Sequence, residues 1–139
     1  MVEIIAGEKG KGKTKYLLDK VNTAIKQADG NLVYLDKSQK HMHELNNRVR
    51  LINVMDYPIT NCDEFLGFVC GIVSQDYDLQ EMYLDSFLTI ANISDEEMVH
   101  AIEKLDVISE KFHVKFVLSV SRNEVDLPDS VKAKLIVSL

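Results

Sequence analysis

The chain has 139 residues, of which 46% are apolar and 27% are charged, so it has the size and composition of one folded domain spanning residues 1–139. The net charge is −6 and arginine occurs only three times, which disfavours nucleic-acid binding through a broad basic face. No apolar stretch approaches the roughly 18 residues that a membrane helix needs. No signal peptide is visible, and two cysteines are too few for a disulfide framework. These features predict a cytoplasmic protein that inserts into no membrane.

The first predicted elements are a short buried strand and an amphipathic helix. Residues 2–6 form an apolar run that is typical of a buried strand. From Thr14 to Ile25 apolar residues recur at helical spacing, which predicts a helix that begins near Lys13. Between these elements the chain reads Gly-Glu-Lys-Gly-Lys-Gly-Lys-Thr over 7–14, which fills every fixed position of the pattern G-x-x-x-x-G-K-[ST].

This loop contains the residue types that phosphate binding requires. Glycines let backbone N–H groups curl around an anion, and the start of a helix adds the positive end of its dipole. Lys13 is expected to contact the β- and γ-phosphates, and the Thr14 hydroxyl is expected to bind Mg²⁺. The predicted nucleotide-binding residues are those of the loop and the lysine that follows it: Gly7, Glu8, Lys9, Gly10, Lys11, Gly12, Lys13, Thr14 and Lys15.

Strands and helices alternate along the rest of the chain. Helices are predicted over 38–49, from Thr60 or Asn61 to about Val73, and over 94–112, and strands over 32–36, 51–54, 82–85, 114–120 and 133–138. Gly67 and Gly71 lie inside the middle helix, where they are expected to permit close packing on the sheet. The alternation predicts right-handed crossovers and the α/β class, with a three-layer α/β/α sandwich around a mostly parallel sheet.

In such sheets ligands bind beyond the carboxyl ends of the strands, where several polar residues of this chain are expected. Asp85 follows the apolar run 82–84 and is the predicted second Mg²⁺ ligand, with Asp36 as the alternative. Arg122 follows the strand 114–120, where an arginine could stabilise the charge of a phosphoryl transition state. His41 and His43 are two residues apart on a predicted helix, so they are expected to face solvent rather than share a metal.

In this order the chain resembles the P-loop NTPase superfamily. Residues 7–14 look like its Walker A loop and Asp85 like its Walker B acid, while Ser119, Ser121 or Arg122 takes the place of its polar sensor residue. A strand lies between the two motifs, as in the RecA-like, additional-strand branch, which implies that the sensor strand lies between the strands of the two motifs. Small bacterial proteins of this length and pattern are sometimes labelled twitching-motility-type ATPases, although such motors have extra domains. The core Gly-Lys-Gly-Lys-Thr also looks like that of corrinoid adenosyltransferases and thymidine kinases.

The chain departs from the additional-strand branch directly after Asp85. The resemblance implies a glutamate there to orient the attacking water, but the sequence has Ser86. Asp56 and Asp36, each at a neighbouring strand end, are the candidate replacements. The catalytic candidates are therefore Lys13, Arg122 and Asp56, and hydrolysis is expected to be slow or to depend on activation by a partner.

These patterns predict a protein that binds ATP and Mg²⁺ and hydrolyses ATP slowly. ATP is preferred over GTP because the chain has no Asn-Lys-x-Asp motif for reading guanine. One alternative is a non-catalytic sensor that binds ATP to switch a partner, which the missing glutamate favours. Another is a small-molecule kinase, which the shortage of arginines disfavours. The small size fits a protein partner or self-association, and no residue pattern identifies which.

Overall fold

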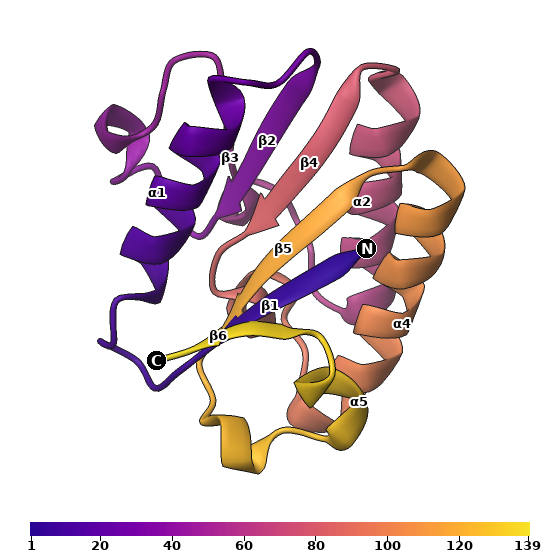
Figure 1. Cartoon of the computed structure of the whole chain (residues 1–139). Helices are drawn as coiled ribbons and strands as arrows, with labels where there is room; N and C mark the ends of the chain where they lie inside the picture. Colours follow the sequence, from indigo (N-terminus) through magenta and orange to yellow (C-terminus); the bar gives the residue numbers. More distant parts are fainter.

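The computed structural model describes residues 1–139, and a six-stranded sheet forms the middle layer of the molecule (Figure 1). The order of the strands is β3-β2-β4-β5-β1-β6, and all neighbouring pairs are parallel. Strand β5 therefore lies between β1 and β4, the order that the resemblance to the additional-strand branch implies. The bounds of the strands are β1 Val2–Ala6, β2 Asn31–Asp36, β3 Arg50–Asn53, β4 Leu79–Leu84, β5 Lys115–Val120 and β6 Leu135–Ser138.

Helices cover both faces of this sheet, which confirms the predicted three-layer sandwich. Helix α1 (Lys13–Ile25) packs on one face, and α2 (Cys62–Gln75) packs with α4 (Asp95–Phe112) on the other (Figure 1). The core on the α1 side contains 11 buried residues, and the core on the α2–α4 side contains 28. No helix combines the length and the apolar character needed to cross a membrane.

The predicted helix over 38–49 is wrong. Only one 3₁₀ turn, η1 (Met42–Glu44), forms in this connection between β2 and β3. Side chains satisfy the backbone instead: Asn22 Oδ1 accepts from the N–H of Asn46 at 2.8 Å, and Asn46 Oδ1 accepts from the N–H of Arg48 at 2.9 Å. Asparagine readily offers such local bonds, which compete with helical ones. The apolar spacing is still used, because Leu45 and Val49 pack in the core beside α1.

The remaining irregular segments contain short turns that the periodicity does not reveal. Helices α3 (Phe87–Ile90) and α5 (Asp129–Lys132) are single turns, too short to show a helical repeat. The 3₁₀ turns η2 (Val54–Asp56) and η3 (Glu124–Asp126) follow β3 and β5, respectively. Ser86, directly before α3, has a left-handed backbone with φ of 54°, so the chain turns sharply at the end of β4.

Two glycines make a matched test of the fold. A Cβ atom at Gly30 would lie 2.1 Å from the carbonyl oxygen of Asp78, which also accepts from the N–H of Asn31 at 2.8 Å. We expect Gly30→Ala to lower the free energy of unfolding by about 1–3 kcal/mol, because the backbone itself would have to move. Gly67 and Gly71 are both exposed, with no neighbouring atom within 4 Å of a Cβ at either position, so the close packing expected there is wrong.

Gly67→Ala is therefore expected to raise the free energy of unfolding by about 0.5–1 kcal/mol, since alanine favours a helix over glycine. Urea denaturation of both variants and the wild type measures these changes in the free energy of unfolding, which should be negative for Gly30→Ala and positive for Gly67→Ala. Equal stability of Gly30→Ala and the wild type would contradict the close contact at Asp78.

Candidate functional site

The glycine loop connects the end of β1 to the first residue of α1. Gly10 and Gly12 have φ of 86° and 94°, in the left-handed region that residues with a side chain disfavour. Gly12 immediately precedes α1, so the first amides of the helix face the loop. Lys13 Nζ donates to the carbonyl oxygen of Glu8 at 2.9 Å, which places the amine across the loop. These features give the loop the form that an anion-binding turn requires.

Lys13 is only 7% exposed, which is unusual for a lysine. Burial lowers the pKa of its amine below the ordinary value of 10.5, while Asp85 opposes the shift and Lys37 adds to it. A lysine with one backbone acceptor has two further N–H donors. Its charge therefore has a carboxylate nearby and donors that are free for an anionic ligand.

The strand register brings two aspartates to the same face of the sheet. Tyr34 pairs with Tyr83 and Leu35 with Leu84 across β2 and β4. The tyrosines belong to the core on the α1 side and the leucines to the core on the other side. Because successive strand residues point to opposite faces, the following residues, Asp36 and Asp85, return to the α1 side. Both are buried, each 2% exposed.

Hydrogen bonds hold Asp85 in place on both of its oxygens. Tyr34 Oη donates to Oδ2 at 2.9 Å, and Ser119 Oγ donates to Oδ1 at 2.7 Å. Ser119 Oγ in turn accepts from the N–H of Ser86 at 2.7 Å. Burial and the neighbouring charge of Asp85 raise the pKa of the Tyr34 phenol far above its ordinary value, so it remains a donor at neutral pH. The orientation of the Asp85 side chain is thus fixed, and each oxygen keeps a lone pair that no hydrogen bond in the structure uses.

Asp36 differs from Asp85 in having an unsatisfied oxygen. Its Oδ1 accepts from the N–H of Lys37 at 2.7 Å, whereas the buried Oδ2 has no hydrogen-bond partner. Burial raises the pKa of Asp36 above its ordinary value of 3.8; the bond from Lys37 opposes this shift, and the charge of Asp85 adds to it. A buried polar atom without a partner is costly, and such atoms are rare in folded proteins.

The loop, the two aspartates and the connection after β2 enclose a cavity of about 470 Å³. No hydrophobic residue lines it, and four of the lining residues are lysines, which gives it the polar, cationic walls that a phosphate chain requires. The lining residues are Lys9, Gly10, Gly12, Lys13, Thr14, Asp36, Lys37, Lys40, His41, Asp85, Ser86, Thr89 and Ser121.

The structure brings together six of the twelve site residues expected from the sequence: Lys9, Gly10, Gly12, Lys13, Thr14 and Asp85. Thr14 and Asp85, the expected Mg²⁺ ligands, line the same cavity as Lys13. The loop residues Gly7, Glu8 and Lys11 and the neighbouring Lys15 do not line it, and the side chain of Lys15 forms an exposed ion pair with Asp19 at 3.3 Å.

Two of the three catalytic candidates lie outside the cavity lining. Arg122 forms a bidentate ion pair with Asp95, with an Nη2–Oδ1 distance of 2.8 Å and an Nε–Oδ2 distance of 3.1 Å. Asp56 lies in the turn after the edge strand β3, where its Oδ1 accepts from the side-chain amide of Asn53 at 3.2 Å. Neither side chain therefore reaches a ligand in the cavity in this arrangement.

The connection after β2 contributes three lining residues that the sequence analysis misses. Lys40 and His41 come from the segment predicted to be a helix, and Lys37 directly precedes it; only their position after a strand end could have indicated this role. His41 is expected in solvent, but its side chain is only 19% exposed and its Nδ1 lies 2.7 Å from Glu44 Oε2.

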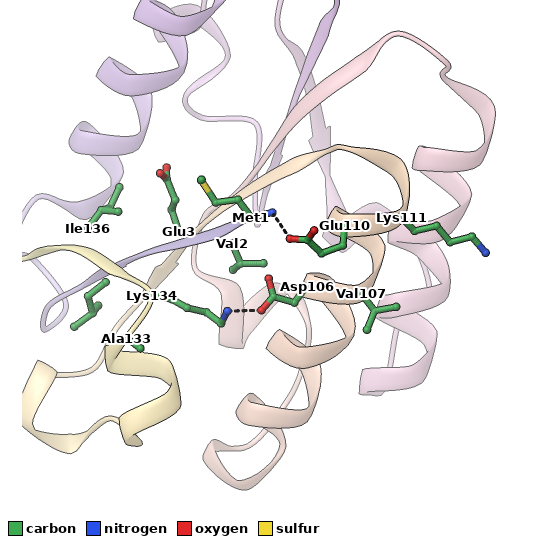
Figure 2. Close-up of a pocket in the computed structure, with 11 residues that line it drawn as sticks. Met1, Val2, Glu3, Asp106, Val107, Glu110, Lys111, Ala133, Lys134 and Ile136 are labelled. Atoms are coloured by element: carbon green, nitrogen blue, oxygen red, sulfur yellow. Dashed lines mark hydrogen bonds and ion pairs between the residues drawn. The ribbon is translucent and has the colours of Figure 1, made fainter.

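A larger hollow, of about 1010 Å³, lies at the opposite edge of the sheet, where β1 and β6 begin (Figure 2). Figure 2 shows two ion pairs in it, Lys134 with Asp106 and the terminal amine of Met1 with Glu110. Glu3 Oε1 lies 3.3 Å from Lys115 Nζ. None of the site residues expected from the sequence lines this hollow.

The chain matches no protein-family model, and no curated protein matches its sequence. The geometry of the polar cavity is therefore the basis for a functional assignment.

Proposed function

We propose that the chain is a P-loop NTPase that binds ATP with Mg²⁺ and hydrolyses it slowly or under the control of a partner. The observation that carries this proposal is the convergence of the glycine loop, the buried Lys13 amine and the buried Asp85 carboxylate on one polar cavity. A triphosphate needs this combination: amides and an amine for its oxygens, and an acid close by for the metal.

The donor set of the cavity fits Mg²⁺. This ion prefers oxygen ligands and usually keeps several waters, so one hydroxyl and one carboxylate are a sufficient protein contribution. Thr14 and Asp85 would hold it, with Tyr34 and Ser119 fixing the carboxylate from behind. When bound, Mg²⁺ supplies positive charge for the phosphate oxygens. Lys13 would bind the β- and γ-phosphates from the other side and stabilise their charge during transfer.

A second candidate function is an ATP-dependent sensor that binds the nucleotide without hydrolysing it. Ser86, the residue after Asp85, supports this function because it has no carboxylate to orient water. The N–H of Ser86 already donates to Ser119 Oγ. In both functions the occupied cavity would communicate with a protein partner or a second copy of the chain.

Calorimetric titration with ATP tests the shared part of both functions. We expect ATP to bind in the presence of Mg²⁺ and to bind at least tenfold more weakly in excess EDTA, since the metal would share the charge of the phosphates. Phosphate release from the same samples separates the ATPase from the sensor, and a GTP titration measures base preference. Failure of both ATP and GTP to bind would overturn the proposal.

A further inference from the structure

The unsatisfied oxygen of Asp36 is the feature of the cavity that phosphate and metal binding leave unexplained. Asp36 is 2% exposed, it lines the cavity, and its Oδ2 has no hydrogen-bond donor. Burying such an atom without a partner destabilises the folded state, so the fold gains nothing from leaving it unpaired. A water or hydroxyl that reached this oxygen would supply the missing donor.

The neighbouring groups are less suited to accept a proton. Both oxygens of Asp85 are hydrogen-bonded and would face the metal. His41 Nδ1 is engaged with Glu44, and the Glu8 carboxylate accepts from the side-chain amide of Asn123 at 2.8 Å. Asp56 does not line the cavity. Asp36 is the only carboxylate of the lining with a free, buried oxygen.

The position of Asp36 also suits a group that accepts a proton in the cavity. Asp36 and Asp85 end neighbouring strands and point to the same face, so Asp36 lies directly beside the proposed metal ligand. Asp36 lines the cavity together with Lys37, Lys40 and His41, which follow it in the chain after β2. Asp36 thus belongs to the wall formed by the connection after β2, and a γ-phosphate held by Lys13 would lie between this wall and the glycine loop.

We propose that Asp36 orients the attacking water and takes its proton, in place of the glutamate that is absent after Asp85. This inference rests on the proposed function. In the step, the water oxygen forms a bond to the γ-phosphorus, and the bond from that phosphorus to the oxygen bridging to the β-phosphate breaks. The electron pair of the broken bond stays on ADP, the water proton goes to Asp36 Oδ2, and Asp36 later releases it to solvent.

The test compares Asp36→Asn, Asp36→Glu and Asp29→Asn with the wild type. Asp29→Asn is the matched control, because Asp29 is an exposed aspartate just before β2, at the end of the strand away from the cavity. Three quantities are measured: ATP·Mg²⁺ affinity by calorimetry, single-turnover phosphate release, and affinity for ADP·Mg²⁺ with aluminium fluoride, which imitates the transferring phosphoryl group. Circular dichroism checks that each variant is folded.

We expect Asp36→Asn to bind ATP·Mg²⁺ within about threefold of the wild type and to release phosphate about 100-fold more slowly or worse, the usual effect of losing a general base. Its complex with ADP and aluminium fluoride should be weaker by a comparable factor, because the lost interaction belongs to the transition state. Asp36→Glu should recover part of the rate, and Asp29→Asn should match the wild type in all three measurements.

Several results would overturn the inference without touching ATP binding. These are phosphate release by Asp36→Asn at the wild-type rate, loss of release in Asp56→Asn instead, or a wild type that binds ATP·Mg²⁺ and never releases phosphate. A fall in ATP·Mg²⁺ affinity in Asp36→Asn equal to that in Asp85→Asn would assign Asp36 to the metal instead. If the wild type binds no nucleotide, the proposed function itself fails, and the role of Asp36 fails with it.

Discussion

Lys13→Ala is expected to weaken ATP·Mg²⁺ binding by about 100-fold or more. The amine is buried beside the glycine loop and has a single acceptor, the carbonyl oxygen of Glu8. In the complex it would exchange this acceptor for charged phosphate oxygens, and hydrogen bonds to charged groups are worth about 1.5–3 kcal/mol each. Two such bonds correspond to at least a hundredfold change in the dissociation constant.

Calorimetry of the variant and the wild type measures this loss directly. Lys26→Ala is the matched control, since Lys26 is an exposed lysine at the opposite end of α1. Thermal unfolding without ligand should be nearly the same for both variants and the wild type, because the Lys13 amine forms only one hydrogen bond in the fold. Unchanged ATP affinity in Lys13→Ala would show that the loop does not hold the triphosphate.

Asp85→Asn is expected to abolish the magnesium dependence of ATP binding. The substitution keeps the size of the side chain, and the hydroxyls of Tyr34 and Ser119 can each accept as well as donate, so the local hydrogen bonds can rearrange. What is lost is the negative charge facing the metal. The affinity of the variant in Mg²⁺ should therefore fall to the wild-type value in EDTA, a change of about tenfold or more.

Tyr34→Phe serves as the control for this variant. It removes one hydrogen bond to Asp85 but keeps the carboxylate and the stacking on Tyr83, whose ring centroid lies 6.3 Å away. We expect it to retain most of the magnesium dependence. A full magnesium dependence in Asp85→Asn would move the metal site away from the end of β4.

The elements around the loop follow from local pattern, and for that reason the sequence predicts them well. Apolar runs ending in Ala6, Leu84 and Val120 and the helical repeat after Thr14 place the strands and α1 within one to three residues of their observed bounds. The choice between Asp36 and Asp56 could not be made in this way. Both lie near the carboxyl end of a strand, and only the cavity lining distinguishes Asp36, beside Asp85, from Asp56, at the sheet edge.

The connection between β2 and β3 shows where pattern reading fails. Met42, Leu45 and Val49 have helical spacing, yet the asparagine side chains offer the backbone bonds that an irregular path needs. This path brings Lys37, Lys40 and His41 to the cavity. Pattern reading also fails at Arg122. Its position after β5 predicts a place at the ligand edge, but its guanidinium forms an ion pair with Asp95, a residue distant in sequence.

The lysine-lined cavity has a consequence for the kinetics of encounter. The chain as a whole carries a net charge of −6, while four of its lysines surround this single opening and further lysines, Lys11 and Lys15, lie next to it. A polyanion approaching most of the surface is repelled, and one approaching this edge is attracted, so diffusion is directed to the site before any contact forms. The rate of association should consequently fall with ionic strength much more steeply than the rate of dissociation rises.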